Sequence, residues 1–235
     1  MSSQSFLSSL YPFLQPSSHR PEIPDADLLQ SVQKKSHDSR AVIHAFFEHQ
    51  GAVVIAVAKA IATIYRSHRR ILTMGNGGSS CDASHLAVEF LHPVTAGRPA
   101  LPALNLAADQ AMMTAVGNDV GFEQVFVRQL EAQGQTGDGV IGISTSGNSD
   151  NLLRAFCKAK DMGILTIGLT GGSGGVMATS PSLDHCLIVP TESIHRIQEC
   201  HVLIYHILWD LVHTLLASDR GPTASSTEDH HEVPR

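Results

Sequence analysis

The chain has 235 residues, of which 43% are hydrophobic and 16% are charged, a balance typical of a globular protein rather than a disordered one. This length predicts one domain with a substantial buried core. Sixteen Lys and Arg residues against 22 Asp and Glu residues give a formal net charge of −6, which argues against a broad surface for nucleic acid or anionic lipid.

The first part of the chain is expected to be an arm followed by helices. Residues 1–24 are rich in Ser and Pro and are assigned to an N-terminal arm. Apolar residues at helical spacing then predict two helices, over 26–49 and 52–67.

The N-terminus lacks the basic and apolar regions of a signal peptide, and no stretch approaches the ~18 uncharged apolar residues of a membrane-spanning helix. With four cysteines that lack CxxC spacing, these features predict a soluble, cytoplasmic protein with reduced thiols.

Short apolar runs alternate with helical stretches along the rest of the chain. The predicted strands are 71–74, 103–106, 140–143, 165–169 and 186–189. This alternation is typical of an α/β fold with a doubly wound, five-stranded parallel sheet. Such a sheet binds ligands beyond the carboxyl ends of its strands. Residues 192–217 predict a long, largely buried helix, and the polar residues 218–235 are expected to form a flexible tail.

A glycine-rich turn follows the first predicted strand. Its sequence is Gly75-Asn76-Gly77-Gly78-Ser79-Ser80, and it leads into a predicted helix. Backbone N–H groups and hydroxyls at a helix N-terminus form a candidate anion site. The turn lacks the lysine of a P-loop, and Ser80 stands where the dinucleotide-binding pattern requires glycine. The alternative is a tight strand-to-helix turn with a serine cap.

A hydroxyl-rich turn follows the third predicted strand. It reads Ser144-Thr145-Ser146-Gly147-Asn148-Ser149 and precedes a helix that begins near Asp150. Hydroxyls and free helix N–H groups can hold a phosphate without a basic residue. Helix capping alone would explain one such cluster, but it explains two at the strand ends of one sheet less well. A third turn, 171–175, is more simply interpreted as a flexible connection.

Two titratable side chains lie in the helix predicted after the first strand. His85 and Glu89 are four residues apart and therefore share one helix face. This spacing suits two ligands of one metal ion or an oriented acid/base pair. An ordinary surface contact between the two side chains is the alternative.

The last helix carries polar residues within an apolar stretch. Gln198 and His201 could share one face, and Gln198, Tyr205 and His206 approximately share another. A buried histidine needs hydrogen-bond partners, so a satisfied core histidine is the alternative to a functional one. By itself, the sequence Gly117-Asn118-Asp119 predicts a turn.

In their order and spacing, these motifs closely resemble the sugar isomerase (SIS) domain proteins of the phosphoheptose isomerase group. The similarity covers residues 40–217 and rests on GNGGS at 75–79 with His85 and Glu89, GND at 117–119, ISTSGNS at 143–149, and RIQE at 196–199 with His206. It implies that residues 25–217 form an SIS domain with a five-stranded parallel sheet flanked by helices. It also implies a homotetramer with active sites between subunits, and conversion of D-sedoheptulose 7-phosphate to D-glycero-D-manno-heptose 7-phosphate.

The resemblance implies a role for individual residues as well. The phosphate would be held by Ser144, Thr145, Ser146 and Ser149. The sugar site would be lined by Asn76, Gly77, Gly78, Ser79, Asn118 and Asp119, with Glu89 and Gln198 also contacting substrate. One zinc ion per subunit would be bound by His85, Glu89, Gln198 and His206. Glu89 would be the base that takes a proton from C1, His206 would be the partner acid/base, and zinc would polarise the ketose oxygens.

One segment departs from the family pattern. Pro93 stands four residues beyond Glu89, where the family isomerases carry an arginine, and Arg98 is a nearby residue that could substitute. Sugar specificity is the property that this departure affects most directly.

Two other functions belong to the same family. Non-enzymatic tetrameric adaptors that bind the bacterial replication initiator have lost the residues matching Glu89 and His206, so keeping both favours an enzyme. An SIS protein that acts on another sugar phosphate is a further alternative.

The expected partners are a phosphorylated sugar and further copies of the chain, without direct binding to nucleic acid or membrane. The product would feed heptose synthesis for lipopolysaccharide or other cell-surface glycans.

Overall fold

The computed structural model describes residues 23–218, so most of the predicted arm (1–24) and all but one residue of the predicted tail (218–235) lie outside the described residues. The described residues fall into two compact units, 23–38 and 39–218. Within the first unit, the described residues belong almost entirely to the first part of a long helix, α2 (Asp25–Arg66). The second unit holds the sheet and the remaining helices.

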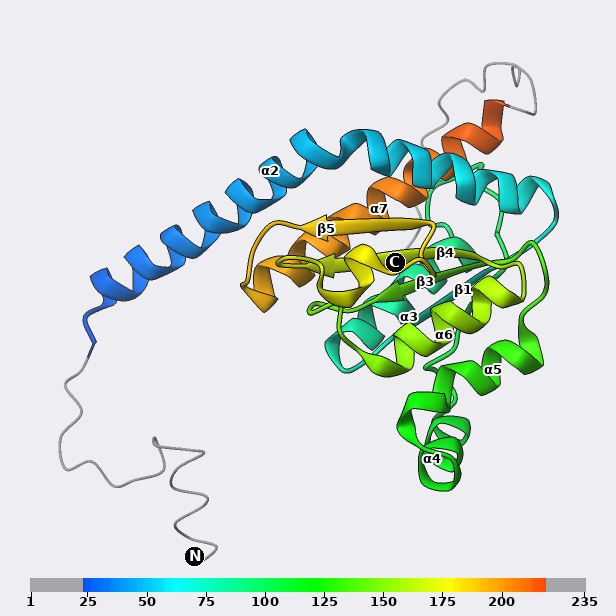
Figure 1. Cartoon of the computed structure of the whole chain (residues 1–235). Helices are drawn as coiled ribbons and strands as arrows, with labels where there is room; N and C mark the ends of the chain where they lie inside the picture. Colours follow the sequence, from blue (N-terminus) through cyan, green and yellow to red (C-terminus); the bar gives the residue numbers. More distant parts are fainter. Residues whose placement is uncertain (1–22, 219–235) are drawn as a thin grey trace, which may run out of the picture. The chain divides into compact units, whose positions relative to one another are not determined.

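The second unit is built on a five-stranded sheet in which all neighbouring strands pair in parallel (Figure 1). The strands lie in the order β2-β1-β3-β4-β5. Their bounds are β1 Ile71–Gly75, β2 Ala103–Asn105, β3 Gly139–Ile143, β4 Leu165–Gly171 and β5 His185–Val189. The predicted doubly wound α/β architecture is therefore confirmed.

Helices cover both faces of the sheet. Beyond α2 they are α3 (Gly78–Leu91), α4 (Gln110–Asp119), α5 (Val125–Gln133), α6 (Asp150–Asp161) and α7 (Ile194–Ser218), with short 3₁₀ turns η2 (Phe122–Gln124) and η3 (Gly175–Thr179). Consecutive residues of β3 belong to different apolar clusters: Val140 packs with α5 and α6, whereas Ile141 packs with α3, α7 and the later part of α2. This alternation explains why every residue of β1 and β3 is buried.

The two helices predicted over 26–49 and 52–67 form one continuous helix, α2. The prediction of a break was wrong because Gly51 has no left-handed backbone conformation and no proline occurs in this segment. A glycine inside a helix lowers its stability by ~1 kcal/mol relative to alanine, which does not end a helix whose later turns are held by the core.

Helices α2 and α7 each contain an 18-residue window that is long and apolar enough to cross a membrane. The expectation that no stretch would approach this composition was therefore wrong. In α7, 44% of the window is buried inside the fold, and Cys200, Ile204 and Leu208 belong to the core cluster. Core helices of soluble proteins satisfy the same criterion of length and composition.

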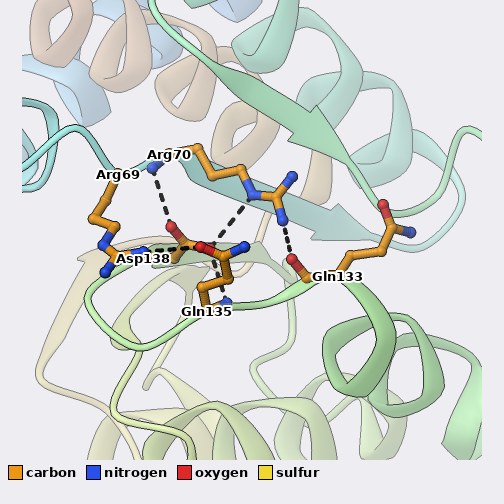
Figure 2. A network of polar contacts seen from close by, with 5 residues as sticks. All are labelled: Arg69, Arg70, Gln133, Gln135 and Asp138. Atoms are coloured by element: carbon orange, nitrogen blue, oxygen red, sulfur yellow. Dashed lines mark hydrogen bonds and ion pairs between the residues drawn. The ribbon is translucent and has the colours of Figure 1, made fainter.

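A polar network joins the segments that enter β1 and β3 (Figure 2). The buried carboxylate of Asp138 accepts hydrogen bonds from the backbone N–H groups of Arg70 at 3.2 Å and Gln135 at 3.0 Å. Arg70 also donates its side chain to Asp138 and to the carbonyl of Gln133, and Arg69 donates to the Gln135 side chain. This network lies at the start of the strands, opposite the edge where a parallel sheet places its ligand-binding loops.

Candidate active site

The turns after β1 and β3 meet at the carboxyl ends of these two neighbouring strands. Asn76, directly after β1, donates its amide to Oδ1 of Asn151 at 2.9 Å, and Asn151 donates back to Oδ1 of Asn76 at 2.9 Å. Asn151 lies in the first turn of α6. The reciprocal pair ties the glycine-rich turn to the helix that follows the hydroxyl-rich turn, because the two strands are adjacent in the sheet.

The hydroxyl-rich turn is arranged around the start of α6. Ser149 occupies the N-cap position, yet its hydroxyl makes no capping bond and instead pairs with the Ser144 hydroxyl at 2.9 Å. Thr145 is half-buried and Ser146 is exposed. Capping by the Ser149 side chain therefore does not account for this cluster, whereas hydroxyls beside a helix N-terminus can contact a phosphate.

The turn over 171–175, expected to be a flexible connection, instead packs against the hydroxyl-rich turn. The N–H of Gly171 donates to the Thr145 carbonyl at 3.1 Å, and the N–H of Met177 donates to the Gly147 carbonyl at 3.0 Å. Gly147 has a left-handed φ of 66°, and a Cβ there would overlap the carbonyl oxygen of Gly174. The third glycine-rich turn thus supports the shape of the second.

Two cavities adjoin Asn76. One, of about 300 Å³, is lined by Gly75, Asn76, Gly77, Ser80, Ala107, Gln110, Met113, Thr114 and Phe122. The other, of about 360 Å³, is lined by Asn76, Phe122, Glu123, Ser149, Asp150 and Asn151. The sequence analysis missed the contribution of α4 and η2, although the segment after β2 must begin at the same edge of the sheet.

Asn118 and Asp119 lie at the end of α4 and are exposed. The Asn118 amide donates to the Asp119 carboxylate at 2.7 Å. Neither residue lines the two cavities beside Asn76. The structure therefore does not bring these two predicted sugar-site residues together with the glycine-rich turn within this chain.

Two helices bring His85, Glu89 and His206 together. The ligand atoms of these three side chains all lie within 4.8 Å of one another. Nε2 of His85 is 3.0 Å from Oε1 of Glu89, and the centroids of the two histidine rings are 5.0 Å apart. The first two residues come from α3 and the third from α7, so the folded chain supplies a partner that the α3 spacing alone could not identify.

The surroundings of His206 favour its neutral form. Burial and the nearby His85 lower the pKa of His206, while the carboxylate of Glu89 acts in the opposite direction. A neutral imidazole can accept a proton or bind a metal ion.

This donor set fits a zinc ion. Two imidazole nitrogens and one carboxylate oxygen are typical zinc ligands, and their mutual separations allow them to meet one ion. The amide of Gln198, the fourth expected ligand, lies against Gly78 at the start of α3, where a Cβ would overlap its Nε2 atom. Glycine at this position therefore leaves room for the Gln198 amide beside the start of α3.

A second layer of contacts surrounds the three side chains. The hydroxyl of Tyr205 lies 2.7 Å from Nδ1 of His85, and Nε1 of Trp209 donates to the Glu89 carbonyl at 2.7 Å. Burial, together with the charges of Asp82 and Glu89, raises the pKa of Tyr205, so its phenol stays protonated. Burial also raises the pKa of Asp82, against the effect of His85.

His201 occupies the core rather than the site. It is fully buried, and its Nε2 lies 3.2 Å from the Thr170 carbonyl, which makes it a donor to that oxygen. Burial lowers the pKa of His201 to about 4, so the ring is neutral. This is the hydrogen-bonded core histidine considered as the alternative.

Arg98 is held against α7. Its Nη2 lies 2.5 Å from Oδ1 of Asp210, and its guanidinium carbon lies 4.3 Å from the centre of the Trp209 ring. Trp209 in turn contacts the backbone of Glu89. The side chain suggested as a replacement for the arginine missing at Pro93 thus has partners on the helix that carries His206.

Comparison with known proteins places these features in one family. A sequence model described as SIS domain matches residues 36–171. A phosphoheptose isomerase of Sulfurimonas denitrificans is 43% identical over 188 residues, which cover 79% of this chain and 94% of that protein. Another from Aneurinibacillus thermoaerophilus is 47% identical over 186 residues, 79% of this chain and 92% of that protein. The solved structure of a phosphoheptose isomerase from Francisella tularensis superposes with a TM-score of 0.74 at 34% identity, covering 82% of this chain and 100% of that one.

Proposed function

Because the chain belongs to the SIS domain family, within its phosphoheptose isomerases, we propose that it converts D-sedoheptulose 7-phosphate to D-glycero-D-manno-heptose 7-phosphate. Moving the carbonyl from C2 to C1 requires a base that takes a proton from C1 and returns one to C2. It also requires a group that moves a proton between O1 and O2. The intermediate is an enediol.

The residues that meet at the site can fill these roles. Glu89 takes the C1 proton and delivers it to C2, and neutral His206 transfers the proton between the two oxygens. Ser144, Thr145, Ser146 and Ser149 hold the phosphate at the start of α6. Asn76, held by Asn151, and the adjacent glycine-rich turn bind the sugar, together with Asn118 and Asp119. Zinc bound by His85, Glu89, Gln198 and His206 would supply a positive charge that polarises the ketose oxygens.

The observation that carries the proposal is the meeting of His85, Glu89 and His206 from two helices. A replication-initiator adaptor needs neither a base nor a metal ligand at these positions. The adaptor function is further disfavoured because the close relatives reported above are named phosphoheptose isomerase.

A homotetramer with sites between subunits forms part of the proposal. Val88, Leu91 and Val94 are 48%, 46% and 81% exposed, and the first two flank Glu89 on α3. Apolar surface beside a catalytic side chain suits burial by another subunit. A partner subunit would also explain why Asn118 and Asp119 lie away from the two cavities of their own chain.

We place the enzyme in the cytoplasm, where its product would feed heptose synthesis for lipopolysaccharide or other cell-surface glycans.

The test is incubation of the zinc-loaded protein with sedoheptulose 7-phosphate, with NMR detection of an aldoheptose 7-phosphate. Wild type should form the product and Glu89→Gln should not, because the amide cannot take the C1 proton. Glu48→Gln is the matched control, since Glu48 also pairs with a histidine four residues away, at 3.3 Å, but on the exposed surface of α2. Fructose 6-phosphate assayed in parallel tests the sugar length.

No product from folded, zinc-bound wild type would refute the assignment of substrate. Turnover by Glu89→Gln equal to that of wild type would refute the assignment of the base.

A further inference from the structure

Both ring nitrogens of His85 have partners. Nε2 lies 3.0 Å from Oε1 of Glu89, and Nδ1 lies 2.7 Å from the hydroxyl of Tyr205. A neutral imidazole carries a single N–H, so one nitrogen donates and the other accepts. With the hydrogen on Nε2, His85 donates to Glu89 and the Tyr205 hydroxyl donates to Nδ1. With the hydrogen on Nδ1, His85 donates to the phenol oxygen instead.

These two arrangements correspond to two states of the proposed site. A histidine that binds a metal ion through Nε2 must carry its hydrogen on Nδ1, because the bound nitrogen needs a free lone pair. Without the ion, a hydrogen on Nε2 satisfies the Glu89 carboxylate. A carbonyl or carboxylate facing Nδ1 only accepts hydrogen bonds, so it could pair with His85 only in the metal-bound state, when Nδ1 carries the hydrogen. A hydroxyl can both donate and accept, so it can pair with Nδ1 in both states.

We propose that Tyr205 is a positioning residue for His85, whose hydroxyl holds the imidazole in one orientation in both tautomers and so favours zinc binding through Nε2. The inference rests on the proposed zinc site. On zinc binding the ring stays neutral, because Nε2 gives up its proton to solvent and Nδ1 takes one up. The phenol then changes from donor to acceptor without moving its ring.

The packing of Tyr205 fixes where this hydroxyl lies. The side chain is fully buried, and its ring makes edge contacts with the rings of His85 and His206, at centroid distances of 5.3 and 4.9 Å. Asp82 lies one turn before His85 on α3, and its Oδ2 is buried without a hydrogen-bond partner among residues 23–218. Its charge acts on both His85 and Tyr205.

Tyr205→Phe removes the hydroxyl and keeps the ring that packs against both histidines. We expect the zinc affinity, measured by competition with a fluorescent chelator, to fall by about 10- to 100-fold, the range typical for loss of a partner behind a metal ligand. In metal-free protein labelled with ¹⁵N-histidine, wild-type His85 should be largely the Nε2–H tautomer. In the variant the Nδ1 shift should change, because this nitrogen loses the hydrogen bond that the phenol donates to it. His85→Gln identifies the signals.

Tyr65→Phe is the matched control. Tyr65 is also a buried tyrosine, on α2, and its hydroxyl has no hydrogen-bond partner within the described part of the chain. Its loss should leave both the zinc affinity and the His85 shifts unchanged. Equal zinc affinity in wild type and Tyr205→Phe, equal losses in both tyrosine variants, or a wild type that binds no zinc would each overturn the inference. Because these readouts need no sugar, they are independent of whether the protein isomerises sedoheptulose 7-phosphate.

Discussion

His201 and His206 lie on the same helix, but their surroundings give them different chemistry. His201 is fully buried and donates to the Thr170 carbonyl, whereas His206 reaches His85 and Glu89. The sequence placed both in an apolar stretch and left open which of them was a core residue. Burial and partners, which depend on how α7 packs on the sheet, make the distinction.

The buried His201 should make the protein less stable in mild acid. Its pKa is about 4 when folded and about 6.5 in the unfolded chain, so between these values only the unfolded chain binds the proton. The free energy of unfolding should therefore fall as the pH is lowered from about 6.5 toward 4, by about 2–3 kcal/mol from this group, with no effect above pH 6.5.

Urea unfolding of wild type and His201→Gln at pH 7 and pH 4.5 measures this difference. The variant should lose less stability on acidification than wild type. His44→Gln, which alters an exposed histidine on α2, should behave as wild type does. The same acid-induced loss in His201→Gln as in wild type would contradict the prediction.

At the scale of elements, α2 contains a replaceable glycine. Gly51 lies inside the helix with helical backbone geometry, and a Cβ there would meet no atom within 4 Å. Gly51→Ala should therefore raise the free energy of unfolding by about 0.5–1 kcal/mol, since alanine loses less backbone entropy on folding. Ala52→Gly, at the neighbouring exposed position, should lower it by a similar amount in the same urea titration. Destabilisation by Gly51→Ala would show that this turn does not tolerate a side chain.

The contact between the hydroxyl-rich turn and the segment after β4 depends on Gly147. Gly147→Ala places a Cβ against the carbonyl of Gly174 and requires a left-handed alanine, so it should lower stability by at least about 1 kcal/mol and weaken binding of the substrate phosphate. Gly97→Ala is the control, because Gly97 has a φ of 80° but open space around it. Thermal unfolding and the KM for the sugar phosphate are the measurements. Equal effects of the two substitutions would leave no role for the contact between the turns.

The sheet was predictable because the strands are short apolar runs between helical stretches, and two of them end at glycine or serine, after Met74 and Ile143. The turn motifs were predictable because a parallel sheet places such turns at one edge. Phe122 and Glu123 carry no comparable pattern, and their place beside Asn76 depends on how α4 and η2 lie against the sheet. The support of Gly147 by Gly174 likewise depends on two loops far apart in sequence.

At the scale of the whole molecule, the exposed apolar residues around Glu89 predict self-association. Size-exclusion chromatography with light scattering should give the mass of four chains. Val94→Asp should shift this mass toward smaller species and lower turnover, because it places a charge on apolar surface that a second subunit would cover. Val32→Asp, an exposed residue of the first unit, is a comparison for the effect of a charge placed elsewhere. A monomer in wild type would refute the tetramer.

Substitutions at the amino ends and at the carboxyl ends of the parallel strands should have different effects in a mutational screen. The Asp138 network ties the starts of β1 and β3, whereas Asn76 and Ser144 follow their carboxyl ends. Substitutions in the network weaken folding, so their defects should be temperature-sensitive and relieved by stabilising changes elsewhere, such as Gly51→Ala. If the turns bind substrate as proposed, substitutions there would remove contacts with it, and their defects should persist at low temperature in such a stabilised background. Rescue by a second, stabilising substitution would thus distinguish positions that maintain the fold from positions that perform the reaction.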